Sequence, residues 1–197
     1  MNRTLVLFDF DGTISTKDTF PLFIVFTRGR IRAYFAYLLY SPAILLYFLK
    51  LYDAENLKKS IMKFHFSGLS KAELQKMSEL FIKKLYDEKI VRPEMLAKIR
   101  EYKRSSIEVC VVSASIDVWL KYFCEKESVS LLCTELKFKD NVFMGELVTK
   151  NCNGAEKAIR IKNKYKLSDF DRIIVYGDSV GDREMFDIST ESHLITK

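Results

Sequence analysis

Short apolar runs recur along the chain, and each ends in small or polar residues. Residues 4–8 (TLVLF) form the first run, residues 107–112 a second and residues 172–176 a third. Continuous apolar runs of this length are typical of strands buried on both faces of a parallel sheet. Residues 131–136 and 142–147 indicate two further short strands joined by a turn at residues 139–141, and residues 193–196 indicate a last strand.

Helical patterns separate these strands. Ser70 and Glu73 form a capping box that begins a helix, and Pro93 suits the first position of another helix. The first of these helices is expected to bury Leu74, Met77, Phe81 and Leu85, and the second Met95, Leu96, Ile99 and Tyr102. Three more helices are predicted at residues 116–126, 155–166 and 182–188.

The alternation of strands with helices predicts an α/β fold with a doubly wound, Rossmann-like parallel sheet. Residues 19–89 interrupt the alternation, because they contain no convincing strand. We therefore predict a core domain of residues 1–18 and 90–197 and an inserted all-helical cap domain of residues 19–89.

The inserted segment contains an unusual aromatic run. Residues 33–49 are seventeen consecutive uncharged residues, in a chain of 197 residues with 13% aromatic content. The run is at the lower limit for a membrane span, and Pro42 interrupts it. We predict a helical hairpin with its bend near Ser41 and Pro42. Packing within the cap or against a second copy, contact with a lipid surface, and a true span all remain open.

Composition excludes several kinds of chemistry. The two histidines, His65 and His193, lack the spacing of a zinc site or of a Ser-His-Asp triad. The four cysteines form no CxxC pair, and no signal peptide is recognisable, so we expect a reducing, cytoplasmic compartment. The net charge of +6 suits an anionic partner. Because the basic residues are scattered, a nucleic acid is not expected.

Polar residues follow three of the predicted strands, where α/β sheets bind their ligands. Asp9 and Asp11 follow the first strand, Ser113 the second, and Asp178 and Asp182 a later one. Carboxylates that converge on one crevice repel each other and require a cation. Their hard oxygen atoms suit Mg²⁺, which keeps coordination positions for water and a phosphate oxygen.

Each feature taken alone has a simpler interpretation. The segment around Gly12 could be an ordinary turn, Ser113 could cap the next helix, and Lys157 could lie on a solvated helix face. The order of all these features along the chain favours a functional site.

The ordered set resembles the four signature motifs of the haloacid dehalogenase superfamily. The matching residues are Asp9-Phe10-Asp11-Gly12-Thr13, Ser113, Lys157 and Gly177-Asp178-Ser179-Val180-Gly181-Asp182. The helical insertion after the first motif resembles subfamily IB, which includes phosphoserine phosphatase. The resemblance covers residues 3–18 and 92–197.

This resemblance implies a Mg²⁺-dependent phosphatase that works through an aspartyl-phosphate. In that scheme Asp9 is the nucleophile, Asp11 the general acid and base, and Ser113 and Lys157 bind the phosphoryl group. The metal would be held by the Asp9 and Asp178 side chains and the Asp11 backbone carbonyl. Asp182 would support the metal site from behind.

Two positions depart from phosphoserine phosphatases. Those enzymes usually have Asn directly before the last Asp of the fourth motif, where this chain has Gly181, so a contact is either missing or supplied by Ser179. They also have a Glu nine residues after the nucleophile, where this chain has Asp18. Asp18 could bind a substrate amine or simply cap the next helix. Asp18 and Arg28 are the candidate substrate contacts.

A second resemblance concerns the inserted segment. Asp18-Thr19-Phe20, the apolar run with its proline, and Gly154-Ala155-Glu156-Lys157 are similar to bacterial phosphatidylglycerophosphatases of the C type, which act on a phospholipid head group. Arg28, Arg30 and Arg32 precede the run and suit an anionic membrane. The predicted function is hydrolysis of a lipid-linked or small organic phosphate monoester. The alternatives are a phosphoserine phosphatase-type enzyme and a non-catalytic docking protein. Oligomeric state is not predicted.

Overall fold

The sheet that organises the fold is parallel throughout. The computed structural model describes residues 3–49 and 51–196. Strands β3 (Ser130–Thr134), β2 (Glu108–Ile116), β1 (Thr4–Phe8), β6 (Arg172–Gly177) and β7 (Glu191–Leu194) lie side by side in this order. Each adjacent pair is parallel, as the apolar runs predicted. The Rossmann-like α/β fold is therefore confirmed.

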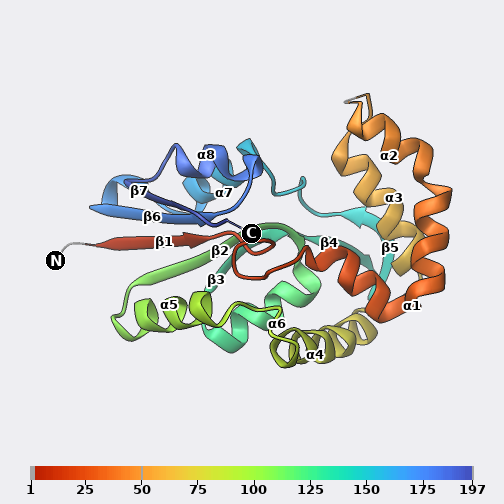
Figure 1. Ribbon diagram of the computed structural model, residues 1–197, viewed down its shortest axis with the longest axis horizontal. Helices are drawn as coiled ribbons and strands as arrows, with labels where there is room; N and C mark the ends of the chain where they lie inside the picture. Colours follow the sequence, from red (N-terminus) through yellow and green to blue (C-terminus); the bar gives the residue numbers. More distant parts are fainter. Residues whose placement is uncertain (1–2, 50, 197) are drawn as a thin grey trace.

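Helices cover both faces of this sheet (Figure 1). The helices on one face are α5 (Pro93–Arg104) and α6 (Asp117–Glu127), and those on the other are α7 (Ala155–Lys164) and the short α8 (Arg183–Phe186), with 3-10 turns at Leu167–Asp169 and Val180–Asp182. Alternate residues of β1 enter the two cores, because successive side chains of a strand point to opposite faces. Val6 and Phe8 pack in one cluster, and Leu5 and Leu7 in the other.

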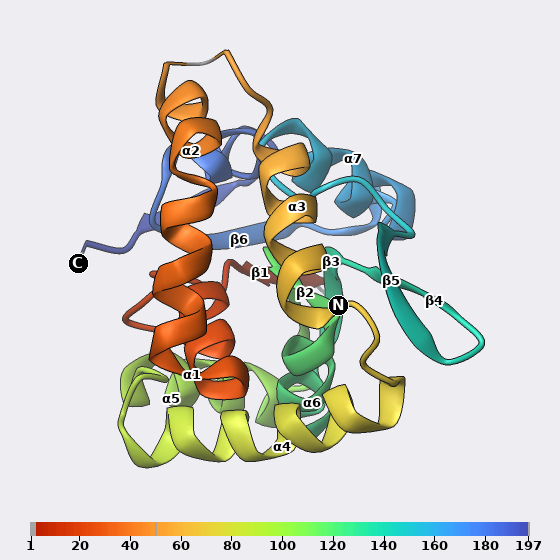
Figure 2. The same cartoon turned by 90° about the vertical axis from the view of Figure 1, so that its right-hand side faces the viewer.

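Between β1 and α5 the described residues form the helices α1 (Thr19–Leu39), α2 (Ser41–Phe48), α3 (Ala54–Phe66) and α4 (Lys71–Asp87). The predicted capping box of Ser70 and Glu73 is present at the start of α4. Helix α4 packs against α6 beside the sheet, whereas α1, α2 and α3 lie beyond the carboxyl ends of the strands (Figures 1 and 2). The division into a core of residues 1–18 and 90–197 and a cap of residues 19–89 stays a prediction.

The predicted hairpin bend at Ser41 and Pro42 is wrong. Helices α1 and α2 meet there at a bend of 60°, which is too small to reverse the chain. Pro42 occupies the first turn of α2, where its missing N–H is tolerated. The reversal comes after α2, so that α3 returns alongside α1 (Figure 2).

Two predicted strands also differ from the structure. Residues 131–136 do not form one strand. The segment instead divides at Glu135 into β3, in the main sheet, and β4 (Leu136–Lys139), which pairs with β5 (Val142–Leu147). This β4–β5 hairpin meets the turn between α3 and α4, where Gly68 N–H donates to Phe143 O at 3.0 Å. Strand β2 is also longer than predicted and includes Ser113.

Candidate active site

A cavity of about 400 Å³ lies between the carboxyl ends of the central strands and helices α2 and α3. Its core side carries most of the polar residues singled out from the sequence. The lining residues are Asp9, Asp11, Asp18, Phe20, Tyr47, Leu57, Lys58, Ile61, Ser113, Ala114, Ser115, Asn151, Asn153, Lys157 and Ser179. The strand ends and helix α7 thus bring together side chains from distant parts of the sequence.

A buried ion network forms the floor of this cavity. Lys157, on α7, is 2% exposed and donates to Asp9 Oδ1 at 2.5 Å and to Asp182 Oδ1 at 2.6 Å. Asp9 itself is held at the end of β1 by its N–H, which donates to Tyr176 O at 2.9 Å. The interpretation of Lys157 as a residue on a solvated helix face is therefore wrong.

Burial strongly affects the charges in this network. It raises the pKa of Asp9 to about 7, although the Lys157 ammonium acts in the opposite direction. Burial alone would lower the pKa of Lys157, but the carboxylates of Asp9 and Asp182 outweigh it and raise that pKa above its usual value. A cation bound beside Asp9 would favour the ionised form of its carboxyl group.

Carboxylate oxygens of Asp9, Asp178 and Asp182 come within 4.8 Å of one another. Asp182 is already fully engaged, because Oδ1 accepts from Lys157 and Oδ2 accepts from Asp178 N–H, Ser179 N–H and Ser179 Oγ. Asp182 is therefore suited to orienting this loop. The hard oxygen donors of Asp9 and Asp178 fit Mg²⁺.

Gly12 allows Asp178 to approach the loop after β1. It has a φ of +85°, and a Cβ at this position would lie 2.1 Å from Asp178 Oδ2. Both the left-handed backbone and the close approach require glycine. The segment around Gly12 therefore does form a turn, as the simpler interpretation expected. The turn also lets Asp178 lie close to the loop after β1.

The carboxylate of Asp11 is held in one orientation. Its Oδ1 accepts from Thr19 N–H at 2.8 Å and Thr19 Oγ1 at 2.6 Å, and its Oδ2 accepts from the Ser115 hydroxyl. Trp119 Nε1 in turn donates to Thr19 Oγ1 at 3.1 Å. Sequence reasoning missed Thr19 and Ser115, because an isolated hydroxyl residue carries no motif.

Ser113 lies within β2, is 1% exposed and lines the cavity. Its Oγ accepts from Ser115 N–H at 3.1 Å. Ile116 holds the N-cap position of α6, so Ser113 does not cap that helix.

The two candidate substrate contacts differ in position. Asp18 lines the cavity and also caps α1, since its Oδ1 accepts from Phe20 N–H at 2.9 Å. Arg28 does not line the cavity, and its Nε donates to His65 O at 2.5 Å. The structure thus brings Asp18, but not Arg28, to the predicted site.

Lys58, on α3, is a cavity residue that sequence reasoning missed. Its Nζ donates to Ala114 O at 2.5 Å and to Asn151 Oδ1 at 3.4 Å, and lies 5.3 Å from the Phe20 ring centroid. Among the described residues it has no ion-pair partner, and burial lowers its pKa. A lysine on a lysine-rich helix gives no local signal of such a position.

Asn153 occupies the space beside Gly181. A Cβ at position 181 would lie 2.3 Å from Asn153 Oδ1, so the glycine leaves room for this carboxamide at the cavity wall. Ser179 is the other residue that the sequence offered to replace the asparagine of phosphoserine phosphatases. It suits that role less well than Asn153, because its Oγ already donates to Asp182.

Known proteins resemble this chain over almost its full length. Residues 6–187 match the haloacid dehalogenase-like hydrolase family. Protein CicA of Caulobacter vibrioides is 30% identical over 191 residues, which cover 95% of this chain and 83% of that protein.

Solved structures share the fold at low sequence identity. A Bordetella pertussis Tohama I protein of unknown function has a TM-score of 0.84 at 19% identity, over 98% of this chain and 89% of that one. A substrate-bound phosphoserine phosphatase has a TM-score of 0.68 at 18% identity, over 98% and 85%.

Proposed function

Because this chain belongs to the haloacid dehalogenase-like hydrolase family, we propose that it is a Mg²⁺-dependent phosphomonoesterase that works through an aspartyl-phosphate on Asp9. The observation that carries this proposal is the network at the cavity floor. There one buried lysine contacts both Asp9 and Asp182, while Asp178 lies close to both carboxylates.

The proposed first step is in-line attack by a carboxylate oxygen of Asp9 on the substrate phosphorus. The Asp9 oxygen–phosphorus bond forms as the bond to the ester oxygen breaks. Asp11 gives its proton to the leaving oxygen. The contacts from Thr19 and Ser115 hold the Asp11 carboxyl group in place during this transfer.

In the second step a water molecule attacks the phosphorus, and the bond to Asp9 breaks. Asp11 takes the proton from this water and is thereby ready for another cycle. Ser113 donates to a phosphoryl oxygen, and the Lys157 ammonium offsets the charge of the transferred group.

Asp9 and Asp178, with the Asp11 backbone carbonyl, would hold Mg²⁺. When bound, the ion supplies positive charge to the phosphoryl oxygens and keeps Asp9 ionised. Asp182 accepts hydrogen bonds from Asp178 N–H and from Ser179, and these bonds fix the conformation of the loop that carries Asp178.

The substrate is a lipid-linked or a small organic phosphate monoester. Lys58 is half-buried and forms no salt bridge among the described residues, although the Asp11 and Asp18 carboxylates attract its charge at longer range. A partly desolvated cation is more stable with an anion beside it. An anionic group of the substrate would fill that role. We also propose a reducing, cytoplasmic location, which the four buried, free cysteines support.

Trapping the intermediate tests this proposal. The protein is mixed with a ³²P-labelled phosphate monoester and Mg²⁺ and then quenched in acid. We expect label on Asp9, released by hydroxylamine, and none on an Asp9→Asn variant. Label retained by Asp9→Asn, or hydrolysis without any covalent label, would contradict the mechanism.

A further inference from the structure

Helix α1 is divided at Gly29, whose φ of +78° breaks the helix. We call residues 30–49, which are the second half of α1 together with α2, the apolar arm. Among these residues only Ala33 and Ala36 are buried, and α2 buries no side chain. Packing against the rest of the chain therefore does not explain the apolar composition of the arm.

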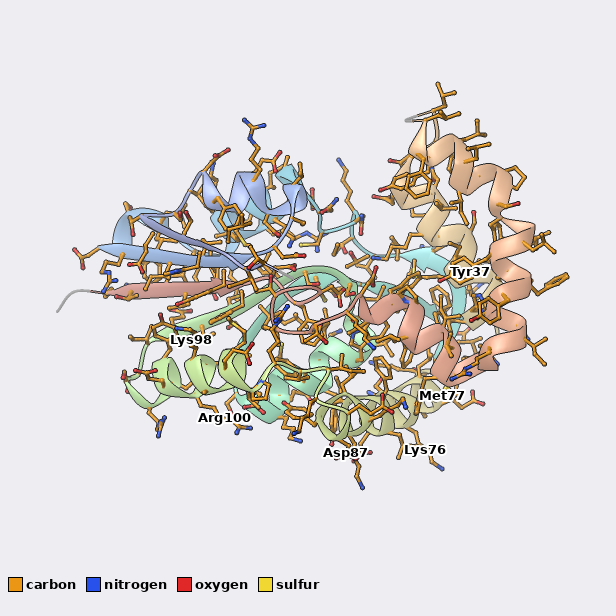
Figure 3. All side chains as sticks on the ribbon, viewed as in Figure 1. Tyr37, Lys76, Met77, Asp87, Lys98 and Arg100 are labelled. Carbon is orange, nitrogen blue, oxygen red and sulfur yellow. The ribbon has the colours of Figure 1, made fainter. Side chains whose placement is uncertain are left out.

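Exposed apolar side chains are concentrated on this arm. It carries eleven of the eighteen large apolar side chains that are exposed among the described residues, namely Ile31, Tyr34, Phe35, Tyr37, Leu38, Leu39, Leu45, Leu46, Tyr47, Phe48 and Leu49. Side chains extend from the outer sides of α1 and α2 with no other element beyond them, and Tyr37 marks the position of α1 (Figure 3). Such a concentration of exposed apolar side chains in one part of the molecule is typical of an interaction site.

The charges around the arm indicate what covers it. No Asp or Glu occurs between Asp18 and Asp53, whereas Arg30 and Arg32 are exposed at the start of the arm. Arg30 has no ion-pair partner among the described residues. A symmetric dimer through this face would bring like charges together with no acid to pair them. Exposed arginines beside apolar and tyrosine side chains suit an anionic lipid surface.

The arm also reaches the cavity. Tyr47 of α2 lines it together with Phe20, Leu57 and Ile61, opposite the floor that contains Asp9. The cavity therefore has a charged floor, and its opposite side combines apolar side chains with Lys58. The apolar part of that side continues into the arm. This arrangement suits a phosphate monoester that carries an apolar chain.

We propose that the apolar arm docks on an anionic bilayer and presents the cavity to lipid-linked phosphate monoesters. The lipid-substrate part of this inference rests on the proposed phosphatase function, whereas the docking part does not. No single described helix is long and apolar enough to cross a membrane, although the bent α1–α2 pair meets the criterion of length and composition. The amphipathic Tyr rings suit the interface between head groups and acyl chains.

Flotation with vesicles tests the docking surface. The vesicles contain phosphatidylcholine, either alone or with about one-third phosphatidylglycerol. We expect the wild-type chain to float with the anionic vesicles, and less so in high salt, because salt screens the arginine contribution. The double variant Leu38→Glu/Phe48→Glu should lower the bound fraction about tenfold or more, since it places charges in the apolar layer. Arg30→Glu should lower it several-fold.

Leu80→Glu is the matched control, because Leu80 is an exposed leucine on α4, far along the chain from the arm. It should float as the wild type does. All these variants should hydrolyse soluble p-nitrophenyl phosphate within about twofold of wild type, since none of the changed residues lines the cavity. Hydrolysis of phosphatidate in vesicles should fall only in the arm variants.

Flotation of the double variant at the wild-type level, or absence of wild-type flotation, would overturn the proposal. A dimer in solution that the double variant dissociates, without vesicle binding, would assign the arm to a second copy. If wild type floats but hydrolyses neither phosphatidate nor p-nitrophenyl phosphate with Mg²⁺, docking stands and the proposed function fails. If it hydrolyses p-nitrophenyl phosphate but never floats, the docking proposal fails and the proposed phosphatase function stands.

Discussion

The cavity floor buries charge, whereas the apolar arm exposes hydrocarbon. Lys157 is 2% exposed with two carboxylate partners, while Phe48, on the arm, is 74% exposed. Both arrangements are costly for a chain that folds alone in water, because buried ions lose hydration and exposed apolar surface favours association. The partners that we propose would offset both costs: a phosphate and a cation at the floor, and a lipid surface at the arm.

The largest expected effect comes from the nucleophile. Asp9→Asn should lower kcat/KM for p-nitrophenyl phosphate by at least about 10,000-fold, because an amide oxygen cannot form the phosphoryl-enzyme efficiently. Asp87→Asn is the control, since Asp87 is exposed at the end of α4. Equal activity of Asp9→Asn and wild type in a steady-state assay would remove Asp9 from the mechanism.

Lys157→Met should lower the stability of the fold. It leaves Asp9 and Asp182 buried without their shared cation, a loss of about 3–5 kcal/mol in the free energy of unfolding. Urea unfolding measures this loss. Lys164→Met, at the end of the same helix, should change stability by less than about 0.5 kcal/mol. Similar unfolding midpoints for the two variants would show that the buried network contributes little.

The sequence predicted the parts of the fold with a local signal. The apolar run of residues 4–8 is β1, and Ser70 and Pro93 begin helices as expected. The continuation of β2 through Ser113 and Ser115 was not predicted, since polar side chains within a strand resemble a loop. These serines are accommodated because they face the cavity.

The site was predictable where a motif carries it, as for Asp9, Asp11 and Asp178, which do lie in one region. Lys58 and Asn153 could not be predicted, because their position depends on how α3 and the segment before α7 pack against the strand ends. The arm's apolar character was visible in the sequence, but its exposure was not, since core helices have the same composition.

Alanine substitutions at Gly68 and Gly12 distinguish the cost of backbone strain from the cost of a steric clash at the cavity floor. Gly68 and Gly12 both have positive φ, but a Cβ meets nothing within 4 Å at Gly68 and meets Asp178 at Gly12. Gly68→Ala should cost about 1–2 kcal/mol of stability. Gly12→Ala should cost more and raise the Mg²⁺ concentration needed for half-maximal activity. Equal losses in urea unfolding, with unchanged Mg²⁺ dependence, would show that Asp178 moves aside freely.

Lys58→Ala probes the side of the cavity nearest the arm. Losing a charge-assisted contact should raise KM for an anionic substrate about tenfold or more, with a smaller effect on kcat. Stability should change less than for Lys157→Met, because Lys58 forms no salt bridge in the described structure and its hydrogen bonds go to the neutral acceptors Ala114 O and Asn151 Oδ1. Lys76→Ala, on an exposed face of α4, is the control. A steady-state analysis in which KM is unchanged would remove Lys58 from substrate binding.

The smallest expected effect on stability is that of a substitution on the arm. It is compared with a substitution in the apolar core. Leu45→Ser replaces a side chain that is 60% exposed, so the free energy of unfolding without vesicles should change by less than about 0.5 kcal/mol. Phe81→Ala, in the core between Phe23 and Trp119, should cost about 3–5 kcal/mol. A loss of more than about 2 kcal/mol for Leu45→Ser, measured by urea unfolding at low protein concentration, would mean that the free protein already covers the arm. The arm would then be part of the fold, and a bilayer would have no exposed face to bind.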